Sequence, residues 1–539
     1  MSRVKRKLQR ILPYAGLLCV IAVFAAIVLW HLDFVPFYDG AAYYNCIADA
    51  VKERFDLLKF RCDGHLSILY LLYLSLPMYA DLGNTTLLYI ANGLLGIASI
   101  VAFHGLLQIV FPAIDRRSRD LATALYALSP LFLAHLFHIN LDFGLTVFFV
   151  LYLRFLLAGQ FERANVFAVA MIFTKETGTP LYAVTLAAYI FAFILHAPTG
   201  WRQKLKGLWT HKVLGFPAVV LGLYAVYYSY YQTGSPYWHY IDLATQNDTT
   251  NFLLNTNLAD PAMWSLLADV FALNFHWIYT IAIALCIALI ALRSSFLQKK
   301  ASSIKPQHLL FLWLVFIGLL YIVTRVRTWN NARYVLITSP IIILLFYWSL
   351  ESILRKAVDR VIALALTLAL VFASNFRTFD LVSIGIFGTF PFGSHPMLQM
   401  STYIRQSAKD NIVYNLEFMH LHYILKQIMQ HVKATSETIF FIGTDGIFFL
   451  PLYVDGTTFA PTARPENSYG VRMFSVTSDM TPEKLREYGS PAEFYYIEFP
   501  NLDNKAQLEY LFSQYQIHTT QEFSHSGYVI KLHTFTFRS

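Results

Sequence analysis

The sequence predicts a polytopic α-helical membrane protein with about eleven transmembrane helices and a soluble α/β domain at its carboxyl end. Of its 539 residues, 56% are hydrophobic and only 14% are charged, whereas soluble domains carry about 25% charged residues. Uncharged apolar segments also alternate with short basic loops, and this alternation stops near residue 376. We therefore expect a transmembrane domain at 1–375 and an extracytoplasmic α/β domain at 376–539.

The excess of basic residues indicates orientation in a membrane rather than nucleic-acid binding. Lys and Arg number 41 against 33 acidic residues, and they fall in clusters between apolar segments. Such clusters mark cytoplasmic loops. The basic run at 3–7 therefore places the amino terminus in the cytoplasm, and an odd number of spans places the carboxyl end outside. We expect an integral protein of a bacterial inner (plasma) membrane, with a periplasmic or extracellular carboxyl-terminal domain and no nucleic-acid partner.

The predicted spans follow in order along the chain. The first, 12–31, has no small-residue cleavage site after it and is read as a retained helix. The first outer loop, 32–84, contains an apolar piece, His65–Tyr79, that Pro77 interrupts, so we expect an interfacial helix there. The remaining spans are expected at 85–111, 121–138, 143–159, 164–174, 177–197, 213–231, 271–292, 308–324, 334–351 and 360–374.

After residue 376 the pattern changes to alternating strand-like and helix-like runs. Strands are predicted at 438–443, 493–499 and 528–537, where β-branched and aromatic residues gather. Helices are predicted at 401–408, 422–432 and 504–515. This alternation is typical of an α/β domain.

Ionisable residues interrupt the chain at the outer ends of several spans. Asp39 lies in FYDGAAYY, Asp142 in HINLDFGL, Lys175 and Glu176 in MIFTKETG, and Arg333 in NNARY. Such residues are costly against lipid and are candidates for function. On one face they would form a polar cavity able to bind an anion and remove a proton. The alternatives are that Asp39 caps a helix and that the others snorkel or pair with each other, as Lys175 with Asp142.

Two of the four cysteines, Cys46 and Cys62, lie in the first outer loop. An oxidising compartment would allow them to form a disulfide. Two free thiols are the alternative. The other two, Cys19 and Cys286, fall inside predicted spans and are expected to be inert.

The order of these elements resembles the GT-C superfamily of membrane glycosyltransferases, especially the protein O-mannosyltransferase and lipid A aminoarabinose transferase group, across nearly the whole chain. The resemblance is carried by FYDGAAYY after the first span, GHLSILYLLYL after the loop, HINLDFGL between the third and fourth spans, FTKETG at the end of a short span, and NNARYVLITSP before a late one. The mannosyltransferases have Asp-Glu where this chain has Asp39-Gly40, and Ser-Arg-Tyr where it has Leu136, Phe137 and His138. These departures argue against protein mannosylation and leave the general reaction intact.

The resemblance implies inverting transfer of a sugar from a polyprenyl-monophosphate donor to a hydroxyl acceptor on a lipid, glycan or protein at the outer face. Asp39 and Asp142 are the implied catalytic residues, with Asp39 as the base and Asp142 orienting the base loop or the sugar. Lys175 and Arg333 are expected to bind the donor phosphate. Further substrate contacts are expected from Glu176, Tyr334, His65 and His138.

No cofactor is expected. The sequence has no glycine-rich phosphate loop, and its 17 His residues are scattered without zinc spacing. A divalent metal remains open without a motif in its support. Two other functions stay open: an oligosaccharide ligase or polymerase, and a secondary transporter, although transporters usually show two related halves that this chain lacks.

Overall fold

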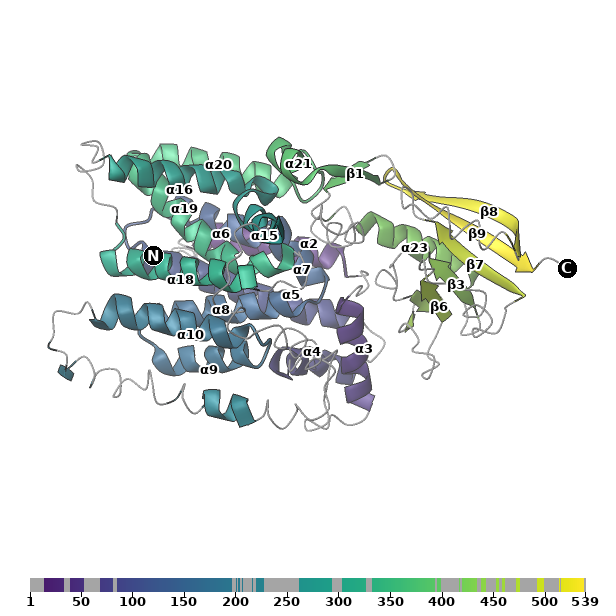
Figure 1. The fold of residues 1–539 in the computed structure, drawn as a ribbon, viewed down its shortest axis with the longest axis horizontal. Helices are drawn as coiled ribbons and strands as arrows, with labels where there is room; N and C mark the ends of the chain where they lie inside the picture. Colours follow the sequence, from purple (N-terminus) through teal and green to yellow (C-terminus); the bar gives the residue numbers. More distant parts are fainter. Residues whose placement is uncertain are drawn as a thin grey trace, which may run out of the picture.

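The computed structural model describes most of the amino-terminal two thirds of the chain and the central strands of the remainder (Figure 1). The described residues are 14–32, 39–52, 68–80, 85–195, 200, 202–203, 206, 216, 220–226, 261–292, 303–325, 332–392, 395–398, 416, 419–433, 438–442, 452–454, 458–460, 472–475, 492–498, 513 and 515–537.

Helices make up the described part of the chain up to residue 387. The α-helices are α2 (Ala15–Trp30), α3 (Asp39–Lys52), α4 (Ile68–Ala80), α5 (Thr85–Val110), α6 (Arg116–Ala127), α7 (Pro130–Phe137), α8 (Leu141–Leu157), α9 (Phe161–Ile172), α10 (Gly178–Tyr189), α15 (Pro261–Phe271), α16 (His276–Ala291), α18 (Pro306–Arg325), α19 (Ser339–Ile353), α20 (Ala357–Ala373) and α21 (Leu381–Phe387). A π-helix, η2 (Ile190–Leu195), continues α10, and two 3₁₀ helices, η3 (Leu273–Phe275) and η4 (Ala332–Thr338), precede α16 and α19.

Four of these helical segments are long and apolar enough to cross a membrane, or five if the bent pair α6 and α7 forms one span, among the residues that are described. The expected count of about eleven is not confirmed. Helices occupy most of the predicted ranges, but several are short: α9 has 12 residues, about 18 Å at 1.5 Å per residue, against a hydrocarbon core of about 30 Å. The range 213–231 lies largely outside the described residues.

The predicted span 121–138 is two helices rather than one. Ser129 caps α7 by accepting a hydrogen bond from the backbone N–H of Phe132, and Pro130 occupies the first helical position. Proline there lacks the N–H that an interior residue would need, so α6 ends before it. The two helices meet at 47°, which turns the end of α7 away from the axis of α6.

The centre of the bundle is the segment formed by η4 and α19. Its apolar window is 89% buried, against 39% for the window that runs from η3 through α16. A helix apolar on all sides belongs in the interior of a bundle. η4 forms the first part of this central segment, so the polar residues of η4 lie at the start of a largely buried segment.

The carboxyl-terminal part contains a mixed five-stranded sheet in the order β6-β3-β7-β9-β8. Parallel pairing joins β3 to β6 and β7, and antiparallel pairing joins β9 to β7 and β8. The strands are β3 (Ile439–Ile442), β6 (Arg472–Ser475), β7 (Glu493–Glu498), β8 (Tyr515–His525) and β9 (Tyr528–Phe537); α23 (Met419–Val432) and two hairpins, β1 (Thr389–Phe392) with β2 (His395–Leu398) and β4 (Leu452–Val454) with β5 (Thr458–Ala460), accompany them.

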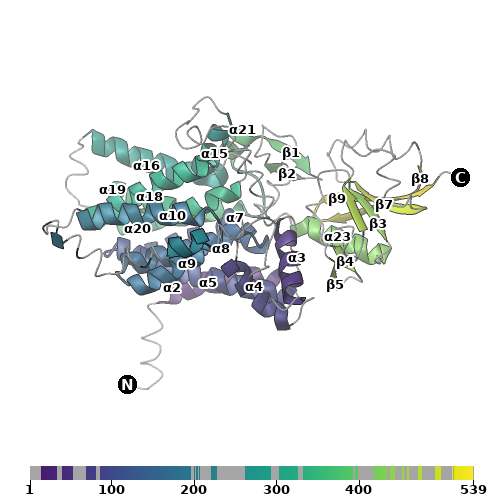
Figure 2. The same cartoon turned by 60° about the horizontal axis from the view of Figure 1, so that its bottom comes forward.

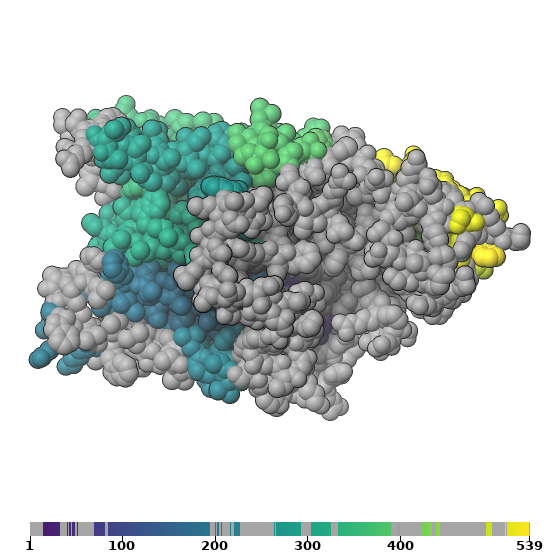
Figure 3. Space-filling model, viewed as in Figure 1, coloured from purple at the N-terminus to yellow at the C-terminus, as the bar shows by residue number. Residues whose placement is uncertain are grey.

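The strands predicted at 438–443, 493–499 and 528–537 and the helix predicted at 422–432 are confirmed as β3, β7, β9 and α23. The helix predicted at 401–408 lies outside the described residues, as does most of the one at 504–515. Figures 1 and 2 place this sheet beyond one end of the helical bundle, the end at which α3 and α4 lie. The same division is visible in space-filling form, with the last strands at one end of the molecule (Figure 3).

The start of α21 is tied to the bundle by a buried carboxylate, Asp380. Its side chain accepts hydrogen bonds from the backbone N–H of Phe275 at 2.8 Å and from the indole N–H of Trp277 at 2.9 Å. Asn274 and Phe275 both have positive φ, 47° and 67°, a conformation that costs energy for residues other than glycine. These bonds hold that strained turn between α15 and α16.

Candidate functional site

Asp142 lies in the first turn of α8, where its conformation is fixed by a helix cap. The side-chain oxygen of Asn140 accepts a hydrogen bond from the backbone N–H of Asp142 at 2.8 Å. A carboxylate in the first turn also interacts favourably with the positive end of the helix dipole. The Asp142 side chain is only 8% exposed, so its charge requires partners within the protein.

Lys175 is the closest partner of Asp142. Its Nζ donates to both carboxylate oxygens, at 2.7 and 2.8 Å. Lys175 sits in the tight connection between α9 and α10, where the backbone N–H of Gly178 donates to the Lys175 carbonyl at 2.8 Å. A Cβ at Gly178 would collide with the carbonyl oxygen of Met171. The glycine therefore permits the close turn that delivers Lys175 to Asp142.

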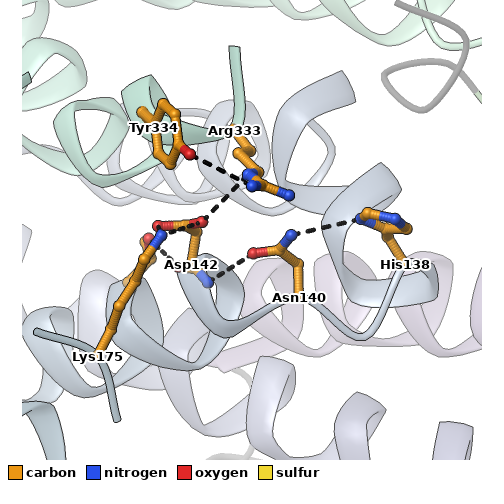
Figure 4. Close-up of polar contacts among 7 residues, drawn as sticks. His138, Asn140, Asp142, Lys175, Arg333 and Tyr334 are labelled. Atoms are coloured by element: carbon orange, nitrogen blue, oxygen red, sulfur yellow. Dashed lines mark hydrogen bonds and ion pairs between the residues drawn. The ribbon is translucent and has the colours of Figure 1, made fainter. Parts of the chain in front are cut away.

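Arg333 and Tyr334 enter the same site from η4 (Figure 4). The Arg333 Nε lies 3.8 Å from Asp142 Oδ2, and its guanidinium donates to the Tyr334 hydroxyl at 3.3 Å. The Tyr334 ring is 4.8 Å from Lys175 Nζ and 5.1 Å from Arg333 Cζ, measured to its centroid. Both cations thus interact with one aromatic ring.

Two cations, Lys175 and Arg333, lie against the carboxylate of Asp142. Burial is the largest single influence and would lower the pKa of the Lys175 ammonium, but Asp142, Tyr334 and Glu176 together outweigh it and raise the pKa above its usual value. Lys175 is therefore charged at neutral pH. Arg333 is always protonated, so two cations adjoin Asp142 in a largely buried place, and the carboxylate of Glu176 also acts on Lys175.

The first residues of α3 lie against the turn between α7 and α8. A Cβ at Gly40 would collide with the carbonyl oxygen of His138, so only glycine allows this approach. Asp39, the first residue of α3, is next in the chain; its side chain is outside what the structure describes. The backbone of Asp39 is thus brought to the loop that carries His138 and Asn140.

That loop is itself strained. Ile139, between His138 and Asn140, has a φ of 50°, which is unusual for a β-branched residue. It is fully buried. Strained residues of this kind persist where surrounding packing fixes them, and they cluster at functional sites.

The structure brings together Asp142, Lys175, Arg333 and Tyr334, all predicted from the sequence. The alternative reading, that Lys175 pairs with Asp142, is confirmed at the same time. Glu176 follows Lys175 in the same turn and contributes to its electrostatic surroundings.

The remaining predicted residues are placed only in part. His65 and Cys62 lie outside the described residues. Cys46 is disulfide-bonded, whereas Cys19 and Cys286 are free. The pairing of Cys46 with Cys62 stays a prediction.

Two polar residues of this region were missed by the sequence analysis. Asn140 caps α8, and the motif Asn-x-Asp before an apolar run is a capping signal that would have revealed it. Asn92 in α5 donates to the Leu136 carbonyl at 2.6 Å and accepts from the Tyr70 hydroxyl at 3.0 Å. It joins α4 to the end of α7, a contact that no local sequence pattern signals.

No group of three or more His, Cys, Asp or Glu side chains among the described residues is arranged to hold a metal ion. The site consists instead of cations, a carboxylate, amides and an aromatic hydroxyl. These groups are suited to binding a phosphate or another oxyanion by charge-assisted hydrogen bonds.

No protein-family model and no curated protein sequence matches this chain. Its fold is similar to that of ArnT from Cupriavidus metallidurans. The structure of ArnT bound to undecaprenyl phosphate aligns with a TM-score of 0.54 at 12% identity, over 96% of this chain and 98% of that one. The apo structure of ArnT aligns with a TM-score of 0.50 at 13% identity, over 96% and 97%. At 12–13% identity, this likeness to ArnT is one of fold.

Proposed function

We propose that this protein is an inverting glycosyltransferase that moves a sugar from a polyprenyl-monophosphate donor to a hydroxyl acceptor on the outer face of the membrane. The observation that carries the proposal is the buried site in which two cations, Lys175 and Arg333, adjoin Asp142 and Tyr334. The fold also supports the proposal. ArnT, whose structure was determined with undecaprenyl phosphate bound, has a similar fold.

Arg333 is the group proposed to contact the phosphate most directly. Lys175 already donates to both oxygens of Asp142, whereas the Nε of Arg333 is 3.8 Å from that carboxylate. A guanidinium can present two parallel donors to a phosphate. Lys175 and Asp142 then act as a fixed pair that holds Arg333 and Tyr334 in place and adds to the field at the leaving group.

Asp39 is proposed as the base. The acceptor oxygen attacks the anomeric carbon, the bond from that carbon to the phosphate oxygen breaks, and the electron pair leaves on the phosphate. The acceptor proton passes to Asp39. Asp142 is a poor candidate for this role because both of its carboxylate oxygens already accept hydrogen bonds from Lys175 Nζ. The approach of Gly40 to His138 brings the start of α3 to the site.

The test is transfer by purified protein in nanodiscs, supplied with synthetic short-chain polyprenyl-phosphate sugars or with the same sugars linked through diphosphate. Consumption of the monophosphate donors, with release of polyprenyl phosphate, is expected. Consumption of the diphosphate donors alone would instead identify a ligase or polymerase and overturn the proposal.

Three variants separate the proposed roles. Asp39→Asn keeps a side chain of the same size but removes the proton acceptor, so turnover should fall by about 10² or more while undecaprenyl phosphate still binds. Arg333→Ala should weaken that binding, by roughly 2 to 4 kcal/mol in the combined constant, and Arg333→Lys should restore only part of it. Normal transfer by Asp39→Asn would show that Asp39 only begins a helix.

A further inference from the structure

The orientation of the Asn140 side chain is fixed by its neighbour. The atom 2.8 Å from the backbone nitrogen of Asp142 accepts a hydrogen bond from it. A backbone N–H can only donate, so this atom must be the amide oxygen, Oδ1. Asn140 is 1% exposed, so water could not supply the missing hydrogen bonds if the amide were reversed.

The other end of the same amide then determines the state of His138. With Oδ1 facing Asp142, Nδ2 faces the Nδ1 of His138 at 3.5 Å, a long contact (Figure 4). An amide NH₂ can only donate, so Nδ1 of the imidazole must accept and carries no proton. The proton of the neutral ring is then on Nε2. A doubly protonated ring would turn two N–H groups toward each other.

Charge in the site favours the same state. His138 is buried, at 2% exposure, and follows closely on His135, with 6.0 Å between the ring centroids. Two cations, Lys175 and Arg333, already lie in this site. An imidazolium would add a third positive charge to this buried region, whereas a neutral ring adds a donor without a charge.

We propose that Asn140 holds His138 in the Nε2–H tautomer, so that His138 is a neutral hydrogen-bond donor to an oxygen of the sugar-phosphate donor. Asn140 is the positioning residue and His138 makes the contact. The inference rests on the proposed function for the identity of the substrate, but the tautomer is a property of the protein alone. The two are therefore tested separately.

The tautomer is measured by solid-state NMR of protein labelled with ¹⁵N-histidine in nanodiscs. The signal of His138 is identified as the one absent from His138→Gln. The wild type should show an unprotonated Nδ1 and a protonated Nε2. Asn140→Asp should move the proton, because aspartate still caps α8 but turns a second acceptor toward Nδ1. A wild-type His138 that is protonated on Nδ1 overturns the proposal, whatever the reaction proves to be.

The contact is tested by adding undecaprenyl phosphate to the same samples. Movement of the His138 Nε2 resonance supports contact with a phosphate oxygen. If that resonance stays in place, the remaining possibility is contact between His138 and a sugar oxygen. In that case Asn140→Asp should lower kcat/KM for the polyprenyl-phosphate sugar by about tenfold, the equivalent of one hydrogen bond. If neither change occurs, His138 does not contact the donor.

Two control variants separate this role from a structural one. Asn140→Ser keeps a helix cap without presenting an acceptor to His138, so it should lose less activity than Asn140→Asp. His138→Gln places an amide N–H near the position of Nε2, and the double variant Asn140→Asp/His138→Gln should recover activity relative to Asn140→Asp. Equal losses in the serine and aspartate variants, without recovery, would show that Asn140 acts only as a cap.

Discussion

At the scale of single residues, Asp142 and Lys175 behave as one unit. Each is 8% exposed and their contact is bidentate. Removing one partner leaves the other charge buried without compensation, which typically costs about 3 to 5 kcal/mol, whereas removing both is far cheaper. Because the charges of Asp142 and Lys175 offset each other, Arg333 is the cation that remains among these three groups.

The corresponding prediction is a double-mutant cycle. Asp142→Leu and Lys175→Met should each lower the thermal unfolding temperature of the purified protein, and the double variant should regain most of the loss. Donor binding should remain impaired in all three. Additive losses in the double variant would mean that the two side chains are not coupled, contrary to their geometry.

A second residue-scale prediction concerns Asp269 in α15, before the spanning helix. Its side chain is fully buried, and neither carboxylate oxygen has a hydrogen-bond partner among the described residues. Burial raises the pKa of this carboxyl well above its usual value. An acid whose folded pKa is raised contributes stability below its unfolded pKa of about 3.9, and this contribution is lost as pH rises toward the folded pKa.

Asp269→Asn should therefore gain stability relative to the wild type as pH increases, by up to about 1.4 kcal/mol per pH unit above pH 4 until the folded pKa is reached. The measurement is the difference between the unfolding temperatures of the two proteins from pH 5 to pH 8. A difference that does not vary with pH would show that Asp269 is ionised in the folded protein.

At the scale of elements, the sequence predicted helices and strands where side-chain periodicity was clear. β7 and β9 are runs of aromatic and β-branched residues, and α23 repeats apolar residues at helical spacing. The break between α6 and α7 was missed because hydropathy averages across it, although Ser129-Pro130 carries the cap and first-turn signature of a new helix.

The junction between α21 and the bundle depends on one side chain, Asp380. Asp380→Ala removes the acceptor for Phe275 N–H and Trp277 Nε1–H. Each buried donor left without a partner costs about 1 to 3 kcal/mol, and the strained turn at Asn274 loses its support. We expect a clearly lower unfolding temperature. Asp380→Asn, which keeps an acceptor oxygen, should lose less, and equal losses in both variants would implicate the charge instead.

At the scale of the whole molecule, the order of the polar motifs along the chain predicted a fold that the structure shares with ArnT at only 12–13% identity. Arg333, Lys175 and Asp142 were predicted to share one face, because the order of the spans alone determines at which face of the membrane each helix ends. Their distances and the bidentate pair depend on close approaches, such as that of Gly178 to Met171, which no local pattern encodes.

The remaining prediction concerns the sides of the membrane. If the carboxyl-terminal sheet is external, a reporter that is active only in the cytoplasm should be silent when fused after Ser539. The same reporter placed after Gly200, beside the basic residues at 202–212, should be active. Activity of the fusion after Ser539 would overturn the predicted topology and, with it, the outer position of the site.

The spacing of the charged residues along the chain also has a consequence for biogenesis. Asp142 and Lys175 are 33 positions apart, and Arg333 is made much later. Since a chain folds from its amino end as it is synthesised, the acid and the amine can enter the membrane as a neutral couple, which reduces the cost of inserting either charge. If the proposed function is correct, the site for an anionic donor is complete only when η4 joins them, so a truncated or half-inserted chain would not bind that donor.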